Sequence, residues 1–259
     1  MKRAALAIAL ALAAPAAAAE ACFAPLAPGI VSGADGYLSV TLEDGREVRI
    51  GGIVPATTTS VGEDLPSLDL AALAGRRVAV RAMADAPQAD RYGRIIGDIV
   101  LEDTGPGLLD GWLREGLALV DPTGMSEACL EVLFTAERAA EMEQRGFWAR
   151  PDGVRSAANP ALSSEAGAFA LVSGLVKSVG ETRSTVYLNF GEDYDSDFTV
   201  LVRRSDARGW DSELADLAGT QIRVRGVLEA WNGGLIRLEH PRQVERLRAD
   251  RALRGLRSP

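Results

Sequence analysis

Short strand-like segments bounded by turn residues occur in two separate blocks of this chain, and their arrangement constrains the fold more than any other feature. The first block has alternating or continuously apolar runs of the kind typical of β-strands, at 37–42, 46–53, 76–82 and 94–101. Glu43-Asp44-Gly45 is a hairpin turn signal between the first two runs. Two amphipathic helical patterns follow, at 108–116 and 126–145.

The second block begins after 151–167, a stretch rich in Gly, Pro, Asn, Ser and Ala that is typical of a linker. Its strand-like runs are 170–178, 185–190, 198–203, 221–229 and 235–239, with a short helical segment at 211–217. Five strands closed into a barrel, with helices added, is the oligonucleotide/oligosaccharide-binding (OB) architecture. We therefore expect a mainly β protein with some α-helix, built from two tandem OB-fold-type domains, at 20–150 and 168–247.

A short internal echo links the two blocks. Leu73-Ala74-Gly75 precedes the strand-like run 76–81, and Leu217-Ala218-Gly219 precedes 220–225 in the same way. The echo predicts a helix-glycine-strand unit at equivalent positions of both domains.

The two ends of the chain have distinct compositions. Residues 1–19 combine Lys2-Arg3, an apolar run and a series of small residues, which is the layout of a secretory signal peptide with cleavage after Ala19. We expect an exported protein without a transmembrane segment, either periplasmic or secreted. The far end, 248–259, is a basic tail, interpreted as a frayed helical end or as a contact for nucleic acid or anionic lipid.

Charge and residue usage exclude several classes of function. Without Lys2 and Arg3, the 28 basic residues fall to 26 against 36 acidic ones, and this net charge near −10 opposes generic polyanion binding. His240 is the only histidine, which excludes a Cys/His metal cluster and a Ser-His-Asp triad and favours a structural role for this residue. The acidic run 192–197 lacks the glycine and closing glutamate of a calcium loop and is interpreted as a hairpin tip.

The chain has two cysteines, Cys22 and Cys129. An even number in an exported protein predicts a disulfide between them. The alternative is a lipoprotein acylated at Cys22, which Ala19-Glu20-Ala21 before it disfavours.

A motif in the first block carries a family resemblance. Asp90-Arg91-Tyr92-Gly93-Arg94, together with the Arg49-containing strand that ends at Gly51-Gly52-Ile53, resembles the staphylococcal-nuclease-like (thermonuclease) family. The Gly146-Phe147-Trp148 ending is similar to the family's Gly-x-Trp. The resemblance implies an OB barrel in which Arg49 and Arg94 clamp a phosphate beside Tyr92.

The same resemblance shows where this chain departs from the family. The family's metal-binding aspartate falls on Val54, its general-base glutamate on or near Ala56, and its other metal ligand on Leu38. Hydrolysis by water needs a metal ion and a carboxylate base, so no confident catalytic residue remains and no cofactor is expected. Asp35 is the nearby metal candidate, with an acidic turn residue as the alternative interpretation.

The second block resembles small bacterial OB-type nucleic-acid-binding modules. The similarity lies in the run 186–191, in 197–200 and in the Trp231-Asn232-Gly233 turn. Aromatic side chains in such grooves stack on bases, which makes Tyr187, Phe190 and Phe198 candidates for binding, with a core position as the alternative.

These observations predict a degenerate thermonuclease-like protein that binds single-stranded nucleic acid or a nucleotide without cleaving it. One alternative is an active, Ca²⁺-dependent phosphodiesterase that uses other carboxylates, for instance Asp35 with Glu63 or Asp64. The other is an envelope scaffold for a protein or glycan partner. The sequence predicts no oligomeric state.

Overall fold

The fold is described from a computed structural model that covers 21–84, 89–101, 107–193, 195–205, 210 and 212–247. The expected signal peptide, 1–19, and the basic tail, 248–259, lie outside these residues. The chain forms two compact units, each described here by itself. Unit 1 takes its described residues from Met1–Ile53, Leu68–Glu115 and Gly124–Glu143, and unit 2 from Val54–Ser67, Gly116–Thr123 and Gln144–Pro259. Within the described residues, no helix is long and apolar enough to cross a membrane.

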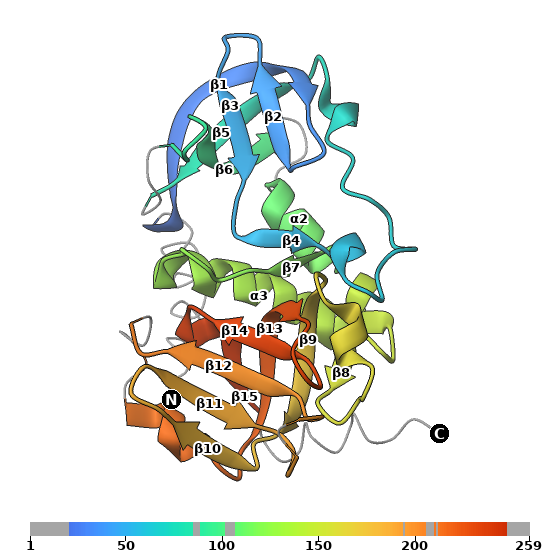
Figure 1. Cartoon of the computed structure of the whole chain (residues 1–259). Helices are drawn as coiled ribbons and strands as arrows, with labels where there is room; N and C mark the ends of the chain where they lie inside the picture. The colour runs from blue at the N-terminus through green and yellow to red at the C-terminus, as the bar shows by residue number, and fades with distance from the viewer. Residues whose placement is uncertain are drawn as a thin grey trace, which may run out of the picture. The chain divides into compact units, whose positions relative to one another are not determined.

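Unit 1 contains a closed five-stranded barrel in the order β1-β2-β3-β6-β5, seen in blue and teal in Figure 1. Its strands are β1 (Phe23–Ala34), β2 (Ser39–Leu42), β3 (Glu47–Ile50), β5 (Arg77–Met83) and β6 (Ile95–Leu101). All neighbouring pairs are antiparallel except β3 and β6. The prediction of a mainly β protein with an OB-like barrel is therefore confirmed for this unit.

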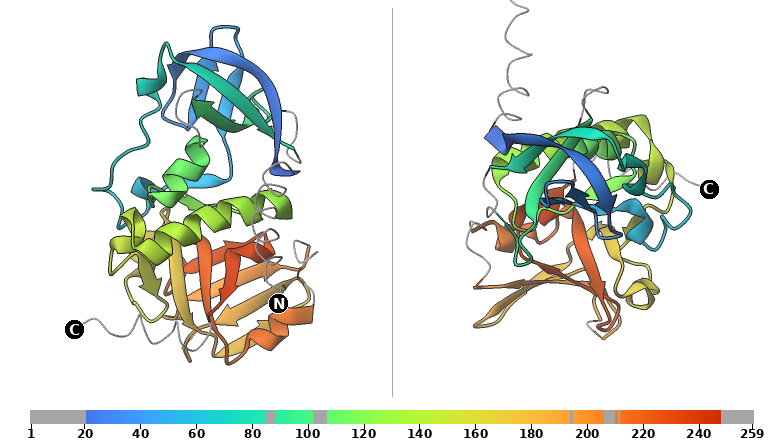
Figure 2. Two further views of the ribbon diagram at one scale, coloured as in Figure 1. Left: turned by 180° about the vertical axis from the view of Figure 1, so that it is seen from behind. Right: turned by 90° about the horizontal axis from the view of Figure 1, so that it is seen from above.

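The barrel's first strand, β1, did not stand out in the sequence. It carries Pro25 and Pro28, and its pairing register shifts between Leu26 and Gly29 against β5 and again between Val31 and Gly33 against β2. These irregularities bend the strand, which runs along the barrel as a long curved arrow in Figure 1 and from behind in Figure 2. A bent strand that pairs on both sides lacks the period-two pattern that identifies straight strands.

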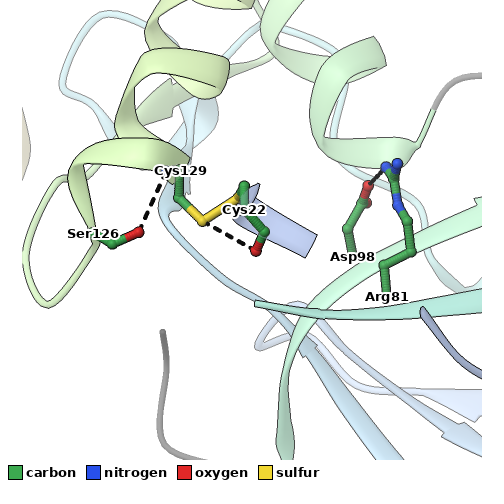
Figure 3. The surroundings of a disulfide bond; sticks show 5 residues. All are labelled: Cys22, Arg81, Asp98, Ser126 and Cys129. Carbon is green, nitrogen blue, oxygen red and sulfur yellow. Dashed lines mark hydrogen bonds and ion pairs between the residues drawn. A yellow bond between two sulfur atoms is a disulfide. The ribbon is translucent and has the colours of Figure 1, made fainter. Parts of the chain in front are cut away.

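Two helices complete unit 1, α2 (Leu108–Arg114) and α3 (Glu127–Glu143). Cys129 on α3 forms a disulfide with Cys22, the residue before β1, as Figure 3 shows. The sequence prediction of this pairing is confirmed. The bridge fixes the start of β1 to the helix.

The strands of unit 2 pair in the order β10-β11-β12-β14-β13-β9-β8, with β15 (Val244–Arg246) on the side of β13. The larger elements are β9 (Phe169–Leu175), β10 (Ser178–Glu181), β11 (Thr185–Asn189), β12 (Thr199–Arg203), β13 (Gln221–Glu229) and β14 (Leu235–Leu238). Figure 2 shows this sheet from behind. As in the unit 1 barrel, the sheet contains a parallel pair that is flanked on both sides by antiparallel pairs, β12 with β14.

A two-residue corner joins β9 to β10 and curls the sheet. The Val176 N–H donates to Thr220 beside β13, whereas the Lys177 N–H donates to Asn189 on β11. These two adjacent residues thus bond beside β13 and to β11, two strands that β12 and β14 separate in the strand order. The curled sheet encloses a core that includes Leu188, Val200 and Ile236, all fully buried.

The segment 151–167, expected to be a linker, is built into unit 2. It contains β8 (Val154–Ser156), which pairs in parallel with β9, and the 3-10 helix η4 (Leu162–Glu165). The buried side chain of Leu162 anchors it in the core.

Other short elements lie between the main strands. They are β4 (Ile53–Pro55), which pairs with β7 (Ala118–Val120), and the 3-10 helices η1 (Ala56–Thr58), η2 (Ala71–Leu73), η3 (Gly146–Ala149), η5 (Ser212–Leu217) and η6 (Pro241–Gln243).

The internal echo corresponds to equivalent structure in the two units. Gly75 follows η2 and Gly219 follows η5, and both glycines have φ +77° before the strands β5 and β13. A positive φ favours glycine, so the repeated residue meets the same backbone requirement twice.

Candidate functional site

The turn that carries Arg94 is organised by one carboxylate. Oδ1 of Asp90 accepts the backbone N–H of Tyr92 at 2.8 Å and of Arg94 at 3.0 Å. Gly93 takes the positive φ of +81° that the turn requires. Oδ2 of Asp90 accepts Nε of Arg94 at 2.9 Å and pairs with Nη2 at 2.8 Å. The Asp-x-Tyr-Gly-Arg motif thus folds into a turn that holds its own arginine.

The ion pair between Arg94 and Asp90 is partly buried, and the Arg94 side chain is 14% exposed. Burial tends to raise the pKa of Asp90, but the hydrogen bonds from Arg94 and from the backbone outweigh it and hold that pKa below its ordinary value. The hydrogen bond from Asp90 likewise raises the pKa of Arg94, with smaller contributions from the charges of Asp35 and Glu47. Arg94 is therefore already neutralised by carboxylates.

Arg49 approaches the same place from the barrel wall. It lies on β3 directly opposite Ser39 of β2, and residues opposite each other in an antiparallel pair share a face. Nη1 of Arg94 donates to Oγ of that same Ser39 at 3.1 Å. Ser39 is thus the cross-strand neighbour of Arg49 and the hydrogen-bond partner of Arg94. Within the described part of the chain, the exposed Arg49 has no hydrogen-bond or ion-pair partner.

Exposed aromatic rings accompany the arginines. Tyr92 is 70% exposed, and Arg94 and Arg91 lie over its ring at 5.1 Å and 5.5 Å from the centroid. Tyr37, on the turn before β2, is 79% exposed. Tyr92 also lines a polar groove of about 450 Å³ together with Asp44, Gly45, Arg46, Glu47, Gly93 and Ile95. We call Arg49, Tyr92, Arg94 and this groove the arginine-tyrosine site.

Leu38, Val54 and Ala56, the positions that the thermonuclease resemblance assigns to carboxylates, have apolar side chains. Ala56 is fully buried at the start of η1, Val54 is half-buried in β4, and Leu38 adopts a φ of +59° in the turn before β2. Asp35 serves that turn, since its Oδ1 accepts the N–H groups of Tyr37 at 2.9 Å and Ser39 at 3.0 Å. Among the residues that the structure describes, no three Asp, Glu, His or Cys side chains gather into a possible metal site.

The other carboxylates considered for a nuclease are on unit 2. Asp64 pairs with Arg150 at 2.6 Å, and Glu63 is exposed beside it. Asp35 belongs to unit 1.

Of the three aromatic candidates on unit 2, only Tyr187 has an accessible ring. It is half-buried on β11, between the core residues Val186 and Leu188. Phe190 and Phe198 lie in the core with their ring centroids 5.1 Å apart. The expectation that these two phenylalanines stack on bases is corrected, because each ring is enclosed by apolar neighbours.

His240 has the structural role that its position indicated. Its Nδ1 accepts the N–H of Arg242 at 3.1 Å, and the Gln243 side chain accepts the N–H of His240 at 2.8 Å. The two contacts form a capping box at the start of η6.

Sequence reasoning missed a buried ion pair between Arg81 on β5 and Asp98 on β6, drawn in Figure 3. Asp98 is fully buried, and its Oδ1 accepts the N–H groups of Ile99 at 2.8 Å and Leu109 at 3.1 Å. The signal available was a lone carboxylate inside the apolar run 95–101.

Comparison with protein-family models finds no match to this chain, and comparison with curated proteins finds none either. Functional inference therefore depends on the residues and geometry described above.

Proposed function

We propose that this chain is an exported, thermonuclease-like protein that binds a phosphate-containing ligand, a nucleotide or short single-stranded nucleic acid, at the arginine-tyrosine site without hydrolysing it. The observation that carries the proposal is Arg49, an exposed cation without a partner among the described residues, placed opposite the serine that Arg94 contacts.

The site has the two kinds of group that such a ligand requires. A guanidinium offers paired N–H donors that match phosphate oxygens, and no partner within the described part of the chain occupies the donors of Arg49. An exposed tyrosine ring supplies a stacking surface for a base, which Tyr92 offers beside the groove.

The local charge predicts selectivity for a small ligand over long polyanions. Asp90 pairs with Arg94, Asp44 and Glu47 line the groove, and the whole chain carries a net charge of −8. Repulsion along an extended backbone opposes the counterion release that drives binding to long nucleic acid. A mononucleotide or a short strand places fewer phosphates against these carboxylates.

Binding without cleavage follows from Leu38, Val54 and Ala56. An apolar side chain can neither coordinate a cation nor accept a proton from water. The arginines alone supply charge stabilisation, which is one component of phosphodiester hydrolysis.

A second OB-type module in unit 2 is part of the proposal. Two features support it: the parallel pair β12–β14 is flanked by antiparallel pairs, as β3–β6 is in the unit 1 barrel, and the corner at Val176 bonds to both sides of the sheet. Tyr187 on β11 is the residue that would contact a base there.

Export is supported by the Cys22–Cys129 disulfide, since such bonds persist in oxidising compartments. The layout of residues 1–19 agrees with it.

A titration tests the binding proposal. Fluorescein-labelled short DNA and RNA strands and a nucleoside bisphosphate are titrated with the oxidised protein, and in parallel with Arg49→Ala and Arg138→Ala. Arg138 is a matched control because it is an exposed arginine on α3, outside the arginine-tyrosine site. Affinity that falls in Arg49→Ala and stays unchanged in Arg138→Ala supports the site. Equal affinity of both variants and the parent, or no binding at all, contradicts it.

A further inference from the structure

A small cavity in unit 1 lies apart from the arginine-tyrosine site. Its volume is about 170 Å³, and its walls come from β1, β5, β6, α2 and α3. An apolar cavity of about 150 Å³ can hold a benzene-sized molecule. Space for a small organic ligand is therefore present.

The walls are mainly apolar. Phe23, Leu109, Val132, Leu133 and Ala136 line the cavity, and Leu109, Leu133 and Ala136 are almost completely buried. Burial of apolar ligand surface against such side chains is favourable because it removes that surface from water. The occupant should be largely apolar.

The polar part of the lining offers donors and no free acceptor on Asp98. Oδ2 of Asp98 is occupied by Nη2 of Arg81, and Oδ1 accepts two backbone N–H groups. Arg81 lines the cavity, its side chain is 31% exposed, and within the described residues its guanidinium is paired with Asp98 through Nη2. The remaining N–H groups of the guanidinium are donors that an occupant with one acceptor atom can satisfy.

The charges in the lining disfavour a charged occupant. Arg81 is already paired with Asp98, and Asp110 also lines the cavity, paired with Arg114 at 2.8 Å. An anion would be repelled by the two carboxylates, and a cation would meet the Arg81 guanidinium.

The disulfide fixes two of the walls. Cys22 is followed directly by Phe23, and Cys129 lies about one helical turn before Val132 and Leu133 on α3. Reduction would release β1 from α3 and with it the spacing of these walls.

We propose that this cavity is a binding site for a small, neutral, mostly apolar molecule with one hydrogen-bond acceptor, which Arg81 contacts, and that the Cys22–Cys129 disulfide maintains the site.

Three probes of nearly equal size test the chemistry: acetophenone, ethylbenzene and benzoate. Each is titrated into the oxidised protein while the amide resonances of Leu109 and Ala136 are followed by NMR. We expect acetophenone to bind, ethylbenzene about tenfold more weakly because it lacks the acceptor, and benzoate most weakly. Absence of shifts with every probe, or benzoate binding as tightly as acetophenone, overturns the proposal.

Variants locate the binding. Ala136→Leu fills the cavity and should abolish the shifts, whereas Ala139→Leu, the same change on α3 outside the lining, should leave affinity unchanged. If Ala136→Leu does not fold, Val132→Phe closes the cavity from its half-exposed side. Retained binding in a folded filling variant contradicts the location.

A double variant tests the role of Arg81 without leaving Asp98 charged and unpaired. Arg81→Met with Asp98→Asn keeps the acceptor for Ile99 and Leu109 and removes the guanidinium. It should bind acetophenone and ethylbenzene equally, and a persisting tenfold preference would contradict a contact with Arg81. Addition of a phosphine reductant should lower the affinity for acetophenone at least about tenfold. Unchanged affinity in the reduced protein would contradict the role of the disulfide.

Discussion

Arg94 holds Asp90 through two nitrogens, with Nε at 2.9 Å and Nη2 at 2.8 Å from the same carboxylate oxygen. The pair satisfies a cation that would otherwise be available to a phosphate. Arg94 is thus held by Asp90, whereas Arg49 on the neighbouring strand has no partner among the described residues. Arg49 is therefore the arginine whose donors can bind a phosphate.

Removing the charge of Asp90 should strengthen anion binding. Asp90→Asn keeps an oxygen for the N–H groups of Tyr92 and Arg94 but no longer neutralises the guanidinium. We expect an affinity for a nucleoside bisphosphate several-fold higher than that of the parent, with some loss of thermal stability. Calorimetric titration and a melting curve measure both, and weaker binding in this variant would mean that the pair positions Arg94 for the ligand.

Asp98 and Asp90 should affect stability in opposite directions with pH. Burial raises the pKa of Asp98 above its ordinary value of 3.8, against the opposing effects of Arg81 and two backbone N–H groups. A raised carboxyl pKa means that the folded state binds the proton more tightly, so this contribution to stability falls as pH rises through the interval from 3.8 to the folded pKa. The lowered pKa of Asp90 has the reverse effect, present above 3.8 and lost as pH falls through the folded value.

Carbon-13 NMR of the two carboxyl groups during a pH titration separates these effects. The midpoint of Asp98 should lie above 3.8 and that of Asp90 below it. An Asp98 midpoint below 3.8 would show that the ion pair with Arg81 outweighs burial.

Reduction of the disulfide should destabilise unit 1. The bridge closes a loop between residues 107 positions apart, and the loss of such a cross-link costs about 5 kcal/mol in the chain-entropy description. Urea unfolding with and without reductant measures the change, with Cys22→Ser/Cys129→Ser as the reductant-insensitive control. Intact-mass analysis after alkylation should find no free thiol in the oxidised protein.

The phenylalanine and tyrosine of unit 2 should respond differently to truncation. Phe198→Ala removes a ring that is 1% exposed and should cost about 3–5 kcal/mol of folding free energy. Tyr187→Ala should cost much less, because the ring is half-buried on the outer side of β11. A severe loss of stability in Tyr187→Ala would mean that this ring, too, belongs to the core.

The sequence predicted local structure wherever one physical signal determined it. The turn signal at Glu43-Asp44-Gly45 lies between β2 and β3, and the run 221–229 coincides with β13. The pairing of Cys22 with Cys129 followed from the cysteine count alone. The turn and the strand are determined by nearby residues, whereas the long-range disulfide was predictable because the chain has two cysteines.

Tertiary context decided what the sequence left open. The bulged strand β1 is defined by its partners on both sides, and no pattern of its own identifies it. Alternation could not tell the core rings of Phe190 and Phe198 from the accessible ring of Tyr187, because the closure of the sheet sets which face is inside. The sequence predicted Arg49 and Arg94 as a phosphate clamp. It did not predict the ion pair between Arg94 and Asp90, which depends on side-chain geometry within the turn.

The measurement that tests the account most directly combines hydrolysis and binding in one preparation. Oxidised protein is incubated with 5′-labelled single-stranded DNA and RNA, with Ca²⁺, with Mg²⁺ and with a chelator, while a nucleoside bisphosphate is titrated into the same batch and into Arg49→Ala. We expect no cleavage above a mock preparation under any condition, and saturable binding that weakens at least about tenfold in Arg49→Ala, because the variant loses a hydrogen bond to a charged group. Divalent-dependent cleavage that Asp35→Ala abolishes, or binding that Arg49→Ala leaves unchanged, would contradict it.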